Sequence, residues 1–158
     1  MRLPNFSASE GGSLWFCERL LEAIAREAPR SYLAIALALG ARVVLVDVDG
    51  DVFRLSMASG RHLFSAGRGG APAVEVRMGR EAVVGLLEAR YGLVDAVLRG
   101  DVLIRGAAAD LAAFDDVLSA VVRGAARAVS APALLDAYLM PAPSVDARPR
   151  VRRLGREP

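Results

Sequence analysis

The chain has 158 residues, 54% of them hydrophobic and only 6% aromatic, and its formal net charge is +2. This length and composition suit one domain with a largely aliphatic core and exclude wholesale disorder. The charge is uneven, because residues 141–158 carry five arginines and two acidic residues, a net +3, and the rest of the chain carries a net −1. A near-neutral body with a basic tail lacks the charge pattern of a groove-binding nucleic-acid protein, so we expect no specific nucleic-acid partner.

All basic side chains other than the histidine are arginine, a bias that is typical of GC-rich codon usage and favours a bacterial source. Cys17 is the only cysteine, which excludes an internal disulfide and a cysteine-based zinc site. The N-terminus lacks the pattern of a signal peptide. The longest apolar run, residues 32–39, has eight residues and is too short to span a bilayer. We therefore expect a cytoplasmic protein without a metal or cofactor.

The first part of the chain predicts a flexible lead-in and two helices. Residues 1–12 are polar and rich in glycine. Ser13 is a suitable N-cap for a helix that carries apolar side chains at helical spacing and ends at Pro29. Ser31 can cap a second helix over residues 32–39, which is apolar on nearly every side.

The middle of the chain predicts strands. Runs rich in valine and leucine over residues 42–47 and 52–57 flank an Asp-Gly pair, which is a strong signal for a hairpin. A weaker strand covers residues 61–64 and is followed by a glycine-rich loop. Val74, Val76 and Met78 then alternate with charged residues, as in a half-buried strand.

Helices dominate the last part of the chain. We predict helices over residues 80–90 and 93–98, a short strand over 102–105 and a long helix over 108–128. The long helix has apolar residues spaced three and four apart, at Leu111, Phe114, Leu118, Val121 and Ala125. A last helix over 132–139 precedes residues 141–158, an arginine- and proline-rich tail that we expect to be disordered.

This order of elements indicates an α+β fold, because most strands come together before the later helices instead of alternating with them. We expect a single domain over residues 13–140. Its core would be one antiparallel sheet of about five strands covered by helices.

Most chemically suggestive residues have a simpler interpretation. Asp47, Asp49 and Asp51 resemble a calcium loop, but the glycine comes one position too early and the twelfth position is not glutamate. We interpret them as turn residues. His62 is the only histidine, with no cysteine nearby, so we expect an exposed or loop histidine and no transition-metal site. The glycines of residues 67–70 lack the lysine and serine or threonine of a phosphate-binding loop.

Acidic and tyrosine side chains give the only catalytic candidates. Four acids fit turns, a first helical turn or solvated helix positions: Asp101, Asp110, Asp115 and Asp116. Asp95 lies among apolar residues and is the one acid that could face inward, the alternative being a polar edge of an amphipathic helix. An enzyme built on this chain would use Asp95, Tyr91 or Tyr138.

One ordered pattern carries a family resemblance. The strand over residues 74–78 leads directly into a helix, and the apolar helix over 93–98 is followed by Arg99-Gly100-Asp101 and the strand over 102–106. From about residue 42 to 139 this order resembles the sterol carrier protein type-2 family of lipid-binding domains, as in a small bacterial stand-alone member. The chain has Ala96 and Val97 where the family often has an aromatic residue, and Gly106-Ala107 where the family often has Gly-Asp.

The resemblance implies an apolar cavity for a fatty acyl, sterol or isoprenoid ligand. Its expected walls, each of which also suits an ordinary core, are Leu86, Leu87, Val94, Val97, Leu98, Leu103, Phe114, Leu118, Leu134, Leu135 and Tyr138. The leading hypothesis is a non-catalytic binding or carrier protein for such a molecule.

Two alternatives stay open. The first is a cavity enzyme that guides cyclisation or isomerisation of a hydrophobic intermediate. The second is an accessory factor, for example in isoprenoid-quinone synthesis, whose basic tail docks to a protein partner or makes a transient contact with a membrane.

Overall fold

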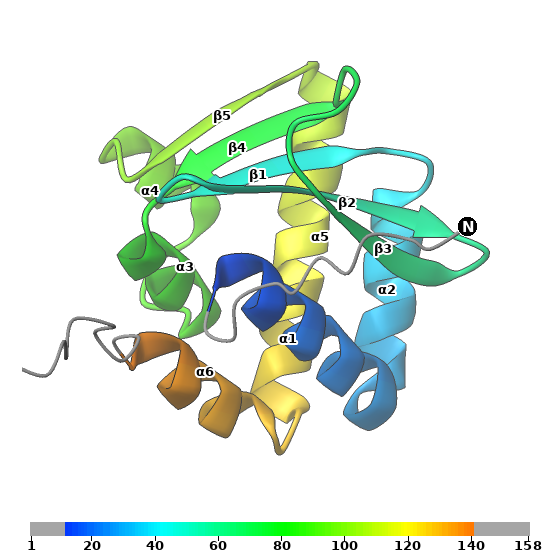
Figure 1. The fold of residues 1–158 in the computed structure, drawn as a ribbon, viewed down its shortest axis with the longest axis vertical. Coiled ribbons are helices and arrows are strands. Elements are labelled where there is room, and N and C mark those ends of the chain that lie inside the picture. The colour runs from blue at the N-terminus through cyan, green and yellow to red at the C-terminus, as the bar shows by residue number, and fades with distance from the viewer. Residues whose placement is uncertain (1–11, 141–158) are drawn as a thin grey trace, which may run out of the picture.

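The computed structural model describes residues 12–140, and over this range the chain forms six helices and five strands (Figure 1). In chain order these are α1 (Ser13–Glu27), α2 (Pro29–Leu39), β1 (Val44–Val48), β2 (Asp51–Ala58), β3 (Arg61–Ala66), β4 (Val74–Met78), α3 (Arg80–Leu87), α4 (Leu93–Leu98), β5 (Val102–Gly106), α5 (Ala108–Arg127) and α6 (Ala131–Leu139). The predicted order of helices and strands is confirmed. The predicted tail and all but the last residue of the predicted lead-in lie outside the described residues.

The strands form one sheet in the order β3-β2-β1-β4-β5. Neighbouring strands are antiparallel except β1 and β4, which run parallel. This pair departs from the expected antiparallel sheet. The connection over residues 67–73 returns the chain to the start of β1, where Val74 pairs with Val44, so β4 runs in the direction of β1. The sheet is therefore mixed but mostly antiparallel.

The helices gather on one face of the sheet. In Figure 1, α1 and α3 lie below the sheet, and α5 runs behind it from top to bottom. The helix α6 packs against α1, and α4 contacts β5. The result is an α+β domain of two layers, with the core between the sheet and the helices.

Side-chain alternation along the strands decides what enters that core. Val46 pairs with Phe53 on one side and with Val76 on the other, and all three face the helices. The next residue of β1, Asp47, points to the opposite face, where its carboxylate lies 3.3 Å from the guanidinium of Arg77. The sheet thus has one apolar and one largely polar face.

The long helix α5 crosses the interior, and its predicted apolar stripe is confirmed: Phe114 is buried, and Leu111, Leu118, Val121 and Ala125 are half-buried against the core. Gly124 marks the close approach of α5 to α1 and α2. A Cβ atom there would lie 2.6 Å from Cγ2 of Ile24 and 3.1 Å from Cβ of Ser31.

The start of α1 differs from the prediction. Gly12 occupies the N-cap position, while Ser13 lies in the first turn and is buried. Its hydroxyl is 2.7 Å from the phenol oxygen of Tyr138 on α6 and makes no cap. Pro29 follows the end of α1 as expected and also begins α2, so Ser31 lies within that helix instead of capping it.

Candidate functional site

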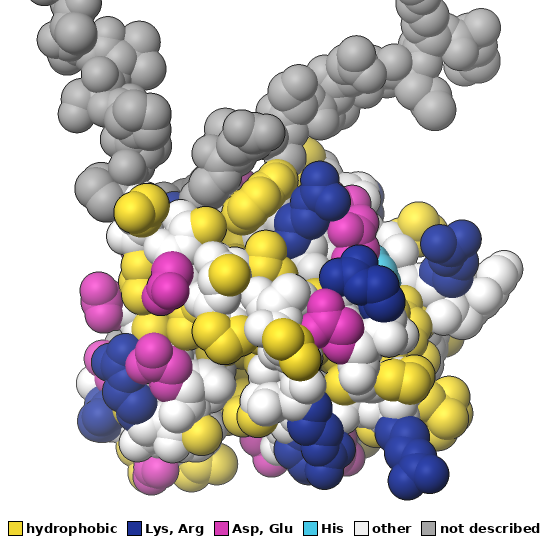
Figure 2. Space-filling model, turned by 90° about the horizontal axis from the view of Figure 1, so that it is seen from below, with side chains coloured by type: hydrophobic (Ala, Val, Ile, Leu, Met, Phe, Trp, Pro, Cys, Tyr) yellow, Lys and Arg dark blue, Asp and Glu magenta, His cyan; other side chains and the backbone are white. Residues whose placement is uncertain are grey.

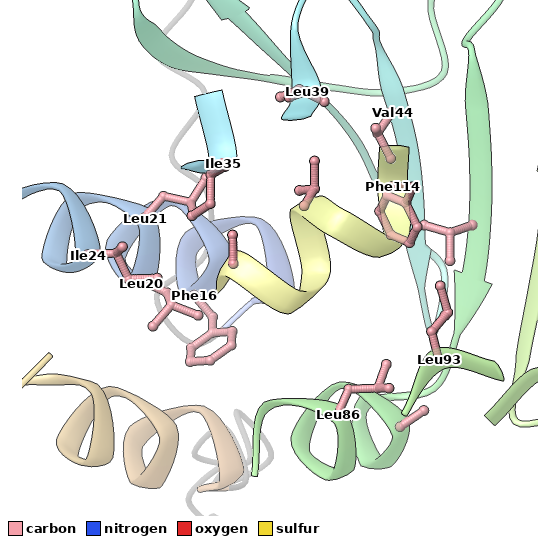
Figure 3. Packing of buried hydrophobic residues seen from close by; sticks show 14 of the residues in the cluster. Phe16, Leu20, Leu21, Ile24, Ile35, Leu39, Val44, Leu86, Leu93 and Phe114 are labelled. Carbon is pink, nitrogen blue, oxygen red and sulfur yellow. The ribbon is translucent and has the colours of Figure 1, made fainter. Parts of the chain in front are cut away.

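An apolar pocket of about 120 Å³ lies between the sheet and helices α1, α3 and α5. Its walls come from these helices and from strands β1 to β4, and every lining side chain is hydrophobic. Figure 3 shows Phe16, Leu86 and Phe114, from α1, α3 and α5, in this interior. The pocket suits an apolar group and has no charged lining residue.

Cys17 shows how apolar this environment is. The thiol lines the pocket, and burial raises its pKa to about 12, with a smaller contribution from the carboxylate of Asp51. A thiol with a raised pKa stays protonated at neutral pH and behaves as a small hydrophobic group. Cys17 is therefore part of the apolar wall.

Four of the predicted ligand-binding residues line this pocket: Leu86, Leu87, Phe114 and Leu118. Leu134, Leu135 and Tyr138 belong to α6, which packs on α1 and contributes no lining residue. They belong to the core or pack against it, a role that each of these residues also suited, and do not line the pocket.

The structure places the other four predicted residues at the surface. Val94, Leu98 and Leu103 are 66%, 81% and 62% exposed, and Val97 is exposed to a lesser degree. The helix α4 buries Leu93 and Ala96 instead. On β5, Val102 faces the core, so the neighbouring Leu103 faces outward.

Most residues of the pocket wall were not among those expected from the sequence. The α1 residues of the wall are Phe16, Cys17, Leu20 and Leu21, and the strands add side chains such as Phe53 and Phe64. The sequence holds a signal for this wall, because Cys17, Leu20 and Leu21 are among the apolar side chains whose helical spacing predicts a helix after Ser13. The resemblance begins near residue 42 and so did not include this helix.

The three catalytic candidates do not come together. Asp95 is exposed on α4. The ring of Tyr91 lies under the guanidinium of Arg99, 3.9 Å from the ring centroid, outside the apolar pocket. Tyr138 is buried, and its pKa is raised chiefly by desolvation, against the lowering effects of Ser13 and Arg80. Its ring stacks on Phe16 at 4.2 Å, which is the geometry of a packing contact.

Two aspartates of the β1–β2 turn, Asp49 and Asp51, accept hydrogen bonds from the starts of two helices. The carboxylate of Asp49 accepts a hydrogen bond of 2.8 Å from the backbone N–H of Arg80, at the start of α3. The carboxylate of Asp51 accepts one of 3.1 Å from the N–H of Leu14, in the first turn of α1. Negative charge is favourable at both positions. Between residues 12 and 140, no group of three histidine, cysteine or acidic side chains is arranged to hold a metal ion.

His62 differs from the expected exposed or loop histidine. It lies on β3, half-buried, with Nδ1 2.7 Å from the phenol oxygen of Tyr32. The backbone N–H of His62 donates to the same oxygen at 2.9 Å. Desolvation lowers the pKa of His62, although the carboxylates of Glu22 and Glu18 oppose this. The contact between Tyr32 and His62 therefore joins α2 to β3, the strand at one edge of the sheet.

A second hollow, which we call the α5 groove, lies beside the pocket. It has a volume of about 380 Å³, and its walls are α5 and residues 86–93, where α3 passes into α4. Its lining is mixed: apolar side chains such as Leu93 and Val122 lie beside the polar side chains of Tyr91, Asp115, Ser119 and Arg123. Leu86 and Leu118 line both the α5 groove and the apolar pocket.

The outer surface of the helical layer is mixed. Figure 2 shows hydrophobic side chains on this face interspersed with arginine and acidic side chains. Over the described range, no single helix is long and apolar enough to cross a membrane; α5 and α6 pass that test only as a pair, bent by 106°.

The fold is that of the sterol carrier protein 2 domains. A solved structure named UbiJ-SCP2 ubiquinone synthesis protein matches with a TM-score of 0.59 and 16% identity, over 78% of this chain and 96% of that chain. Sterol carrier protein domain 2 of Helicoverpa armigera matches with 0.56 and 15%, over 74% and 94%. Sterol carrier protein 2 of Yarrowia lipolytica matches with 0.53 and 10%, over 75% and 98%.

These similarities confirm the fold that the sequence resemblance implied. At 10–16% identity they concern the arrangement of the chain and not its ligand or activity. No protein-family model and no curated protein matches the sequence.

Proposed function

We propose that this chain is a non-catalytic binding or carrier protein that holds a hydrophobic molecule in the apolar pocket. The observation that carries the proposal is the composition of the pocket wall, which is hydrophobic at every lining position. A ligand held there gains free energy by removing apolar surface from water and needs no polar partner. The fold supports the same conclusion, because two of the similar proteins are named as sterol carriers.

The size of the pocket limits the ligand. Drug-sized ligands occupy sites of roughly 300–1,000 Å³, and an apolar cavity of about 150 Å³ takes one benzene. At about 120 Å³ the pocket accepts one end of a narrow aliphatic chain, and a sterol ring system would have to widen it. A lipid with a linear chain is therefore favoured over a sterol.

Native mass spectrometry of the gently purified protein, before and after addition of dodecanol, tests this proposal. We expect one bound dodecanol per chain. Val121→Phe, which adds volume at a lining residue, should abolish the adduct. Val129→Phe makes the same exchange at a residue that is 90% exposed and should leave binding unchanged. A wild-type protein that binds neither dodecanol nor any co-purifying lipid would refute the proposal.

A second candidate function is an accessory role in isoprenoid-quinone synthesis. The observation that favours it is the similarity to the structure named as a ubiquinone synthesis protein. In this role the basic residues 141–158 would dock to a partner enzyme. Removing them should abolish co-purification of enzymes of that pathway while dodecanol binding persists, and unchanged co-purification would contradict the docking role.

A further inference from the structure

The apolar pocket and the α5 groove share two side chains. Leu86 on α3 and Leu118 on α5 line both hollows, so they form the boundary between a groove with charged side chains and a wholly apolar pocket. Leu86 is buried and Leu118 is half-buried. A ligand whose aliphatic chain passes between these two leucines would have one end in the α5 groove and the other in the apolar pocket.

The α5 groove has the size of a ligand subsite, and one side of it carries polar side chains. Its volume of about 380 Å³ falls within the usual range of ligand sites. Asp115, Ser119 and Arg123 follow one another at intervals of four on α5, so they share one helix face. A rise of 1.5 Å per residue places Arg123 about 12 Å along the helix from Asp115.

Arg123 and Asp115 place a positive charge at one end of this helix face and a negative charge at the other. Within residues 12–140, neither Arg123 nor Asp115 makes a hydrogen bond or ion pair, so the guanidinium keeps all its donors for a ligand. An anionic group is attracted to the Arg123 end, where the hydroxyl of Ser119 lies one turn away, and is repelled from the Asp115 end. A bidentate guanidinium contact suits a carboxylate or a phosphate.

We propose that the chain binds a single-chain amphiphile whose carboxylate or phosphate head lies in the α5 groove on Arg123 and whose aliphatic tail passes between Leu86 and Leu118 into the apolar pocket. This inference rests on the proposed function and adds the route and the class of head group. A single tail follows from the pocket volume of about 120 Å³. The polar head stays hydrated at the mouth and avoids the cost of burial without a partner.

Arg123 is tested by comparing dodecanoate, dodecyl phosphate and dodecanol, which have the same chain. Arg123→Gln should weaken binding of both anions about three- to ten-fold and leave dodecanol unchanged. Arg30→Gln, at an exposed arginine of α2 outside the groove, is the matched control and should bind all three probes like the wild type. Loss of only one anion with Arg123→Gln would identify the head as carboxylate or as phosphate.

The proposed passage between Leu86 and Leu118 is tested with Cys17, the only cysteine, which lines the apolar pocket. Methyl methanethiosulfonate should label it slowly, and bound dodecanoate should slow the reaction further. Leu118→Ala should speed labelling by opening the boundary, whereas Leu118→Trp should block both labelling and dodecanoate binding. Ala126→Gly, at an exposed residue of α5 outside both hollows, controls for a general loosening of α5 and should change neither labelling nor binding.

The outcomes separate this inference from the proposed function. If dodecanoate and dodecanol bind equally well and protect Cys17, but the Arg123 and Leu118 variants behave as the wild type, the inference is overturned and the carrier function stands. If neither probe binds the wild-type chain, both fail together.

Discussion

The hydroxyl of Ser13 and the phenol oxygen of Tyr138 lie 2.7 Å apart although 125 residues separate them in the sequence. Both side chains are buried where α1 meets α6. The ring of Tyr138 stacks on Phe16, and the guanidinium of Arg80 lies 4.3 Å from its centroid. These contacts of Tyr138 connect the last helix, α6, to α1 and to the start of α3.

Tyr138→Phe should destabilise the domain by about 1–3 kcal/mol, because it leaves the buried hydroxyl of Ser13 without its partner. Urea denaturation measures the change. Removing both hydroxyls, in Ser13→Ala with Tyr138→Phe, should recover part of the loss. A single variant as stable as the wild type would show that this hydrogen bond contributes nothing.

Gly124→Ala should lower the free energy of unfolding by about 1–3 kcal/mol, despite the helix propensity that alanine adds. The new methyl group would come within 2.6 Å of Ile24 and 3.1 Å of Ser31, both buried. Thermal or urea unfolding gives the measurement. Gly70→Ala, at a glycine with no neighbour in the way, is the control and should change stability little. A stabilised Gly124→Ala variant would mean that α5 can shift away from α1 and α2.

Protonation of His62 should destabilise the fold. Because desolvation lowers its pKa from 6.5, the unfolded chain binds the proton more readily, and stability must fall as pH drops below about 6.5. Most carboxylates titrate below pH 5, so melting temperatures between pH 7 and 5 isolate the histidine. An NMR titration should give a pKa below 6.5, and His62→Asn should flatten the pH dependence. A raised pKa would contradict the burial of this ring.

Glu27 should stabilise the start of α6 above pH 4.5. Its carboxylate accepts hydrogen bonds from the hydroxyl and backbone N–H of Ser130, at 2.6 and 3.0 Å. These two bonds, with a smaller effect of Arg26, lower the pKa of Glu27 to about 2. The stabilisation is complete above the unfolded value of 4.5 and is lost as pH falls towards 2. Glu27→Gln should reduce the melting temperature at pH 7 and weaken the acid dependence below pH 4.5. Glu22→Gln, at an exposed pair with Arg19, should do neither.

Part of the pocket wall could be predicted from the spacing of apolar residues in the sequence. The spacing of Phe114 and Leu118 on a predicted helix placed both on the inner face, and both line the pocket. The same kind of argument failed for Val94 and Leu98 because α4 has only six residues, too few for its apolar pattern to indicate which side is covered. Small Ala96 lies on the buried side, where a longer helix would usually carry larger side chains.

The sequence by itself determined the order of helices and strands and the apolar face of the longer ones. Those features follow from the repeat of apolar residues along a few turns or a few strand positions, which is a property of neighbouring residues. The tertiary structure decided the parallel pairing of β1 with β4, the use of Asp49 and Asp51 at two helix starts, and the contact of Tyr32 with His62. It also decided that Leu86 and Leu118 meet at the boundary of two hollows. Each of these joins segments distant in the chain, and their positions depend on how the helices and the sheet pack, which no local repeat encodes.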